Sequence, residues 1–126
     1  MAYGTLAVDT LNSSTGVLAS QNGMTGIAKA WVNFAGASGS LNNSFNISSV
    51  TRNSTGVYTI NFATAMPNAN YVVNINVQDT QSSINHPICL IDNVTPPTTT
   101  AFKVNTLYYN NTFYDFPAVF VSIIGS

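Results

Sequence analysis

The sequence predicts an all-β protein, with a single antiparallel β-sandwich or jelly-roll-like domain over residues 27–126 and an extended N-terminal arm over residues 1–26. Three observations predict this class. Apolar residues recur with a period of two, as in half-buried strands. Stretches rich in Gly, Pro and Asn separate these segments and are typical of turns. No window holds an apolar 3.6-residue period over three turns, so we expect no helix.

Eight short segments are expected to form strands, which favours a sandwich over other all-β architectures. The clearest is 70–78, where the odd-numbered residues from Tyr71 to Val77 are apolar and Asn74, Asn76 and Gln78 lie on the other face. In chain order the segments are 5–11, 27–34, 44–51, 57–62, 70–78, 88–91, 101–108 and 118–124.

Segments 44–51 and 57–62 are predicted to pair as an antiparallel hairpin. Tyr58, Ile60 and Phe62 face inward in the second of them, by alternation. The connection, 52–56, is short and polar and ends in a glycine, which tolerates positive φ. A further turn is expected at 66–69, because Pro67 presets φ at about −65° and supplies no ladder donor.

The last segment, 118–124, is apolar on both faces apart from Ser122. A strand of this kind is either central in a sheet or covered by another subunit. Both possibilities stay open at this point, and the second makes oligomerisation plausible.

Residues 1–26 differ from the rest. After segment 5–11 comes a polar passage, 12–16, followed by Gly23 and Gly26. We interpret this region as an arm plus a linker. The alternative is a first edge strand with its loop.

Charge is scarce throughout the chain. It carries seven charged side chains, no Glu and a net charge of −1, against 17 Asn, 13 Ser and 15 Thr. Catalysis relies mainly on ionisable groups, so a structural or binding role is expected and an enzyme is not. Three strong cations cannot neutralise a run of phosphates, so nucleic acid is an unexpected partner.

The residues that carry most site chemistry do not form a convincing constellation. His86 and Cys89 are three apart and would project to opposite faces of a strand, so Cys89 is expected to be a buried, inert thiol and His86 to begin a strand. Asp79, Asp92 and Asp115 lie in expected loops or strand ends, where Asp caps turns. No calcium-loop spacing is present, and we expect no metal and no cofactor.

Neither end of the chain has the pattern of a membrane or export segment. The N-terminus lacks a basic and then apolar signal sequence, and the longest apolar stretch is far too short to span a bilayer. We expect synthesis in a cytoplasm and no membrane insertion.

One segment, 107–116, has the composition of a contact surface. Aromatic rings offer apolar area, and Asn and Asp can hydrogen-bond sugar hydroxyls or another chain. The candidates for a glycan or subunit contact are Tyr108, Tyr109, Asn111, Phe113, Tyr114 and Asp115. The alternative is that alternate aromatics enter the core or a subunit interface.

Five segments resemble, in their order and spacing, a small β-rich domain of tailed-phage virion proteins that is often labelled tail-fibre-like. They are GTLAVDTL (4–11), GIAKAWVNF (26–34), NISSVT (46–51), GVYTINF (56–62) and AMPNANY (65–71). The resemblance covers roughly the first 70 residues.

This resemblance implies a non-enzymatic virion component, commonly a homotrimer, that attaches to other virion proteins of the capsid or tail through its N-terminal part. Leu6, Val8 and Leu11 are then the candidate attachment residues. Fibre proteins have a long repetitive shaft, and no repeat is visible here, which favours a capsid-decorating protein or a short tail-attached knob, made in the host cytoplasm and located in the virion. The alternative is a tail-fibre tip that binds a host-surface glycan or receptor.

Overall fold

The computed structural model describes residues 27–79 and 86–125, and within them it contains eight strands and no helix. The predicted all-β class is therefore confirmed. The strands are β1 (Ala28–Phe34), β2 (Leu41–Phe45), β3 (Ile47–Ser54), β4 (Val57–Phe62), β5 (Val72–Val77), β6 (Pro87–Ile91), β7 (Ala101–Tyr108) and β8 (Val119–Ile124). The predicted strand 5–11 and the candidate attachment residues Leu6, Val8 and Leu11 lie outside the described residues.

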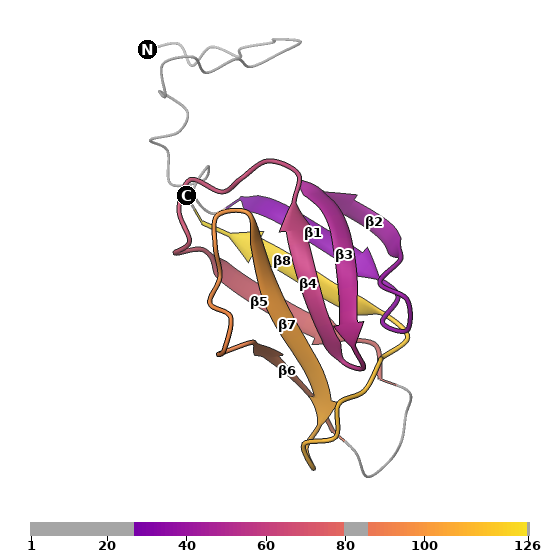
Figure 1. Cartoon of the computed structure of the whole chain (residues 1–126). Coiled ribbons are helices and arrows are strands. Elements are labelled where there is room, and N and C mark those ends of the chain that lie inside the picture. The colour runs from indigo at the N-terminus through magenta and orange to yellow at the C-terminus, as the bar shows by residue number, and fades with distance from the viewer. Residues whose placement is uncertain (1–26, 80–85, 126) are drawn as a thin grey trace, which may run out of the picture.

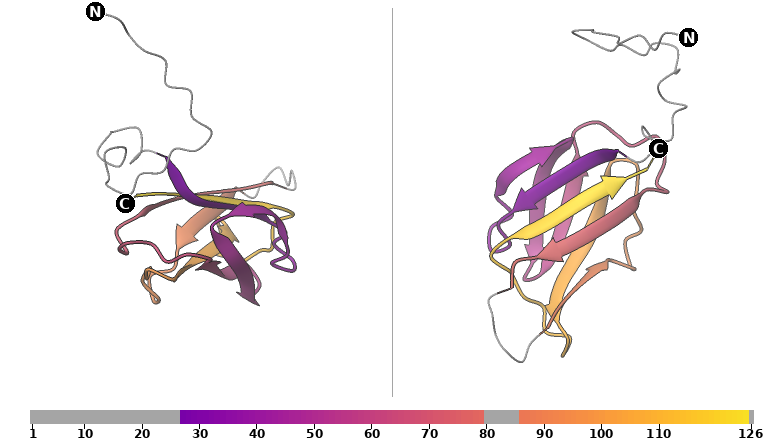
Figure 2. Two further views of the ribbon diagram at one scale, coloured as in Figure 1. Left: turned by 90° about the horizontal axis from the view of Figure 1, so that it is seen from above. Right: turned by 180° about the vertical axis from the view of Figure 1, so that it is seen from behind.

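Two four-stranded sheets pack face to face as a β-sandwich (Figure 1). Sheet A has the strand order β2-β1-β8-β5, and sheet B has the order β3-β4-β7-β6. All neighbouring strands run antiparallel. The two layers are seen from above in the left view of Figure 2.

The core lies between the sheets and follows the period of two that the sequence predicted. In β4 the side chains of Tyr58, Ile60 and Phe62 are buried, and in β5 the apolar residues from Val73 to Val77 pack against the same cluster. Phe62 meets the ring of Tyr71 edge to face at a centroid distance of 5.4 Å. Burial of apolar area on this scale is the main stabilising term for such a domain.

Strand β8 lies in the middle of sheet A, between β1 and β5. Its inner residues Val119, Val121 and Ile123 are buried, which accounts for one of its two apolar faces. On the other face, the side chain of Phe120 remains 41% exposed. The central position thus agrees with the first of the two sequence alternatives, although it leaves the outer face of the strand uncovered.

The predicted single strand over 44–51 is wrong, because the structure divides it between the two sheets. β2 ends at Phe45 in sheet A and β3 begins at Ile47 in sheet B, with Asn46 between them at φ 53°. Asn tolerates this left-handed conformation better than most residues. The Asn46 side chain also accepts a hydrogen bond from the Thr64 N–H (2.7 Å) and donates to the Lys29 carbonyl (3.3 Å), which fixes the crossover.

The hairpin between β3 and β4 is confirmed, but its loop is shorter than predicted. β3 continues to Ser54, which pairs with Val57, so only Thr55 and Gly56 form the turn. Gly56 has φ 67°, which is the conformation that its position in the predicted loop required.

Candidate functional site

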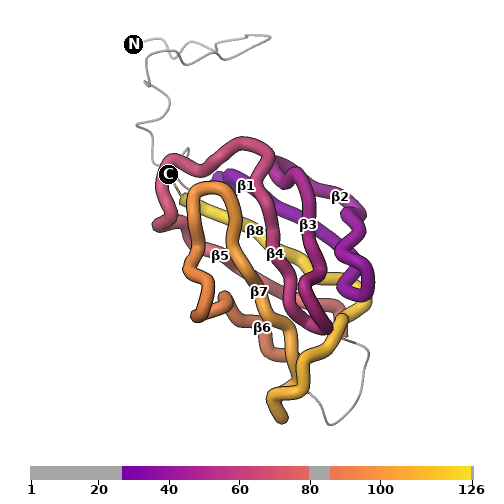
Figure 3. Tube along the Cα trace, in the orientation of Figure 1, coloured from indigo at the N-terminus to yellow at the C-terminus, as the bar shows by residue number. Residues whose placement is uncertain are grey.

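The predicted contact segment 107–116 is divided by the fold between the inside and the outside of the molecule. Figure 3 shows the chain passing beyond the end of β7 before it runs back to β8. Tyr108 is buried and packs with Tyr114 and Phe116 in a cluster of three rings, with centroids 4.8 to 5.2 Å apart. The alternative prediction for this segment, that some of its aromatic side chains enter the core, is therefore correct for Tyr108 and Phe116.

Tyr109, Asn111 and Phe113 instead remain exposed. Asn111 has φ 65° and forms the turn, donating its backbone N–H to the Tyr108 carbonyl. Phe113 bridges to Leu107, which pairs with Ile88 of β6. Phe113 and Ile88 thus lie on the outer side of sheet B.

These exposed residues continue onto the edge strand β6. Leu90 is 48% exposed and, by alternation, lies on the same outer side as Ile88. We refer to Ile88, Leu90, Tyr109 and Phe113 as the Leu90 surface. It is apolar, and none of its four members is charged.

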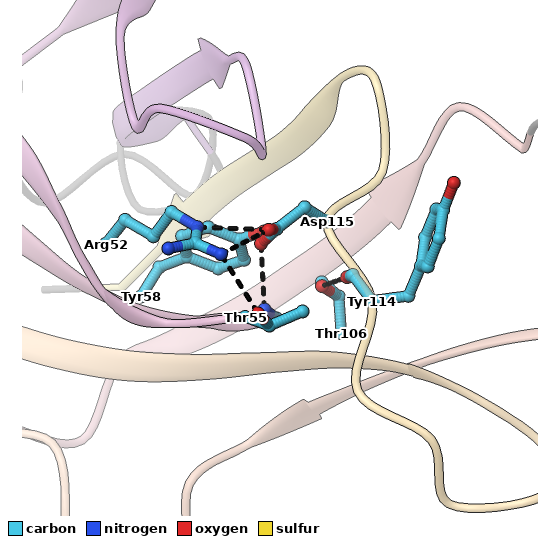
Figure 4. Close-up of polar contacts among 7 residues, drawn as sticks. Arg52, Thr55, Tyr58, Thr106, Tyr114 and Asp115 are labelled. Carbon is cyan, nitrogen blue, oxygen red and sulfur yellow. Dashed lines mark hydrogen bonds and ion pairs between the residues drawn. The ribbon is translucent and has the colours of Figure 1, made fainter.

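The Asp115 side chain connects segment 107–116 to the β3–β4 hairpin by hydrogen bonds (Figure 4). Its Oδ2 accepts hydrogen bonds from the Arg52 guanidinium, from Nε at 3.0 Å and from Nη2 at 2.5 Å. Its Oδ1 accepts from the Gly56 N–H at 2.8 Å and from the Tyr58 hydroxyl at 2.7 Å. All four donors come from the hairpin, so this carboxylate is part of the fold and is not a free ligand-binding group.

The protonation of this cluster follows from its contacts. Burial by itself would raise the pKa of Asp115, but the hydrogen bonds from Arg52, Gly56 and Tyr58 outweigh it and the pKa lies below its ordinary value. Burial, together with the hydrogen bond to Asp115, raises the pKa of Tyr58 well above its ordinary value. At neutral pH the carboxylate is therefore charged and the phenol is neutral, which suits a structural link.

The expected turn-capping role of Asp is confirmed at Asp92 and takes another form at Asp115. Asp92 Oδ1 accepts from the backbone N–H groups of Val94 (2.9 Å) and Thr95 (2.8 Å), which is a local turn. Asp115 caps the turn of a different hairpin, which is remote in sequence and was not predictable from local spacing.

Cys89 and His86 do not act together. Cys89 pairs with buried Thr106 and faces inward, but it is only partly buried, so the expectation of a buried thiol is wrong. It lies on β6, which is the last strand of sheet B among the described residues. Burial still raises the pKa of its thiol. His86 is exposed and lies just before β6.

Residues 27–79 and 86–125 contain no group of three or more His, Cys, Asp or Glu side chains placed to hold a metal ion. They also contain no helix of the length and apolarity needed to cross a membrane.

A second uncharged surface lies on the outer side of sheet A, which the right-hand view of Figure 2 faces. Cross-strand pairing places two rows of side chains there. One row is Asn33, Phe120 and Asn76, and the other is Phe45, Trp31, Ser122 and Asn74. We refer to these seven residues as the Trp31 face.

A groove of about 330 Å³ crosses the Trp31 face, lined on β1, β8 and β5 by Trp31, Asn33, Asn74, Asn76, Phe120 and Ser122 together with Val32 and Val121. Trp31 is 37% exposed, and none of the described residues that line the groove is charged. Asn33 Oδ1 accepts from the Asn42 amide at 3.0 Å, whereas the side chains of Asn74 and Asn76 make no hydrogen bond within the described part of the chain.

Sequence reasoning did not find this groove, although two signals pointed toward it. Segment 118–124 is apolar on both faces, so Phe120 lies on a side of the strand for which the sequence offered no core to pack against. Asn74 and Asn76 were correctly placed on the outer side of their strand. The two signals could not be combined from the sequence, because the strand order that places β8 between β1 and β5 exists only in the folded sheet.

Comparison with known proteins does not assign a family: no protein-family model matches the chain, and no curated protein or solved structure matches it significantly.

Proposed function

We propose that this protein is a non-enzymatic structural component of a tailed bacteriophage particle, as a capsid-decorating protein or a short tail-attached knob, and that it assembles as a homotrimer. The resemblance of its first 70 or so residues to tail-fibre-like domains supports the particle as its location. The observation that carries the mode of action is the Leu90 surface, an uncharged apolar area on an open sheet edge.

Strand β6 has the features of an assembly contact. It ends sheet B, and its sequence PICLI contains no charged residue. Exposed sheet edges are ordinarily protected by charges, bulges or a covering segment, because they offer unpaired backbone groups to other chains. Leu90 and Phe113 (44% exposed) add apolar area beside this edge. A neighbouring copy that covers β6 would bury both, and threefold repetition of that contact closes a ring.

The charged groups support a role without catalysis. Arg52 and Asp115 bind each other. The pKa of Asp92 is lowered, first by the hydrogen bond from the Thr95 backbone and then by that from the Asn105 side chain. Neither carboxyl is thus suited to donate a proton at neutral pH.

The homotrimer is tested by measuring the mass of the full chain in solution with light scattering after size exclusion. We expect a trimer for the wild type and a monomer for Leu90→Lys, because a charge at the centre of the contact would lose its water. Val94→Lys is the matched control, since Val94 is 84% exposed and lies outside the Leu90 surface. A monomeric wild type, or a trimer that survives Leu90→Lys, would contradict the proposed contact.

The virion location is tested by imaging purified particles with a label on this chain. A label spread over the capsid lattice supports a decorating protein, and one confined to the tail supports a knob. Particles that carry no label would refute the proposed location.

A second role, a tail-fibre tip that binds a host-surface glycan, is favoured by the groove of the Trp31 face. The predicted glycan segment 107–116 supports it less, because Tyr108 and Asp115 are engaged in the fold. Its test is whether the purified chain binds to intact host cells.

A further inference from the structure

We infer that the groove of the Trp31 face binds an uncharged pyranose unit of a glycan. This inference deepens the second proposed role, on which it rests, and moves the binding site from segment 107–116 to the opposite sheet.

The apolar half of the site is formed by Trp31 and Phe120. Asn33 pairs with Phe120 and Trp31 pairs with Ser122, so the two aromatic residues are diagonal neighbours on β1 and β8. Both are partly exposed and line the groove. The face of an aromatic ring is negative and attracts the weakly positive C–H groups that a pyranose presents on its apolar side.

The polar half is formed by amides on both sides of β8. Asn33 on β1 and Asn76 on β5 flank Phe120, and Asn74 lies beside Ser122. A carboxamide has two N–H donors and an acceptor oxygen, so it can serve a sugar hydroxyl in either direction. The side chains of Asn74 and Asn76 have no hydrogen-bond partner among the described residues.

The absence of charge in the lining of the groove sets the ligand class. Sialic acid, phosphate or a uronic acid would bring a negative charge to a site at which none of the described lining residues is a cation. A neutral sugar carries no such cost. The volume, about 330 Å³, lies near the lower end of the range for small-molecule sites, which is about 300–1,000 Å³.

A second copy of the chain fits the groove less well. A protein contact would cover Asn74 and Asn76, and each amide left without a hydrogen-bond partner would disfavour that contact. A sugar ring carries several hydroxyl groups, each of which can hydrogen-bond one of these amides. The Leu90 surface, with no free amides among its four members, is the better contact between copies.

The test uses the full chain on an array of immobilised neutral oligosaccharides containing glucose, galactose, mannose or N-acetylglucosamine, with sialylated oligosaccharides beside them. We expect saturable binding to at least one neutral glycan and none to its sialylated counterpart. Titration calorimetry with that glycan should show an affinity at least about tenfold weaker for Trp31→Ala and for Asn76→Ala, and a smaller loss for Trp31→Phe.

Val94→Lys is the matched control, because Val94 is 84% exposed and belongs to neither the Trp31 face nor the Leu90 surface, so this variant should retain sugar binding. Asn76 is exposed on the sheet, so Asn76→Ala should fold even if Trp31→Ala does not, and circular dichroism checks both. No binding to any neutral glycan, or equal affinity in Asn76→Ala and the wild type, would overturn the inference. If Trp31→Ala instead dissociates the oligomer and no sugar binds, the face is a subunit contact and the inference is wrong. Binding to host cells without binding to any neutral glycan would overturn the inference while leaving the second role in place.

Discussion

At the scale of single residues, Asp115 receives four hydrogen bonds through its side chain. One carboxylate accepts hydrogen bonds from Arg52, Gly56 and Tyr58, which belong to β3, its turn and β4. The neighbouring Thr106 hydroxyl donates to the Tyr114 carbonyl at 2.7 Å and holds the same segment against β7. A segment without regular secondary structure is thereby fixed to sheet B by its side chains.

Asp115→Asn is expected to reduce the pH dependence of stability. The pKa of Asp115 is lower in the folded state than in the unfolded state, so its stabilising contribution is present above the unfolded pKa of about 3.9 and is lost as pH falls through the folded pKa. The free energy of unfolding of the wild type should therefore fall more between pH 7 and acidic pH than that of the variant. Urea unfolding at both pH values measures this.

At pH 7 the Asn variant should be less stable by about 1–3 kcal/mol, mostly through weakened hydrogen bonds to partly buried donors. The ion pair itself adds little, because the Arg52 side chain is about a third exposed and solvent screens it. Asp79→Asn, which removes a charge at an exposed position, is the control. An identical loss of stability with acid in the wild type and Asp115→Asn would refute the structural role.

At the scale of elements, the β3–β4 hairpin depends on Gly56 for two separate reasons. Its φ of 67° is unfavourable for residues with a side chain. A Cβ at this position would also lie 2.3 Å from the Thr106 carbonyl oxygen and 2.8 Å from the Tyr114 nitrogen, both of which are backbone atoms. The hairpin turn therefore packs directly against β7 and the segment after it.

Gly56→Ala is expected to lower the free energy of unfolding by about 1–3 kcal/mol. The strained φ of the new residue and the clash of its side chain with the backbone atoms of Thr106 and Tyr114 act together. Thermal unfolding followed by circular dichroism measures the change. Thr55→Ala is the control, because it alters the same turn and removes only an exposed hydrogen bond with Arg52. A melting temperature for Gly56→Ala equal to that of Thr55→Ala would show that the turn tolerates a side chain.

Strands β8 and β6 each have one side that packs within the fold and another side that carries an exposed apolar side chain. The backbone of β8 pairs with β1 and β5, and its inner residues fill the core, yet Phe120 projects from the outer side. β6 has no neighbouring strand on one edge within the described part of the chain, and its Leu90 is exposed. These two open sides are where we place the sugar and the neighbouring subunit.

At the scale of the whole molecule, the scarcity of charge means that contacts depend on shape, apolar area and uncharged hydrogen bonds. Of the seven charged side chains in the sequence, Arg52 and Asp115 neutralise each other within the fold. Both the Trp31 face and the Leu90 surface consist of uncharged residues.

We therefore expect solubility, melting temperature and oligomeric state to change little between about 0.01 M and 1 M sodium chloride, over which the Debye length falls from about 30 Å to about 3 Å. The protein concentration of a saturated solution measures solubility across this range, scanning calorimetry measures the melting temperature, and light scattering measures the oligomeric state. Sodium sulfate serves as the contrast, because it strengthens apolar burial and should stabilise the protein. A steep dependence on sodium chloride would mean that ion pairs dominate after all.

Much of the fold was predictable because alternation is a local property of an extended chain. From Tyr71 to Gln78 the residues face inward and outward in the structure as alternation predicted, with the apolar Val72 exposed on the outer side. Asn46 was not recognised as a break, because a single residue at positive φ between two polar stretches leaves the period almost unchanged. The candidate site was less predictable, since segment 107–116 has no regular period and its aromatics are divided by long-range packing.

The sequence by itself determined that the protein is all-β, which residues of most strands face inward, and that its surface is almost uncharged, because each of these depends on local pattern or on composition. Tertiary structure alone decided that Trp31, Asn76 and Phe120 share one groove and that Asp115 binds the β3–β4 hairpin. These residues are remote in the chain, and antiparallel pairing of β8 with both β1 and β5 brings the first three together. No local property of the chain encodes which strands become neighbours when they are remote in the sequence, since that choice depends on how the whole core packs.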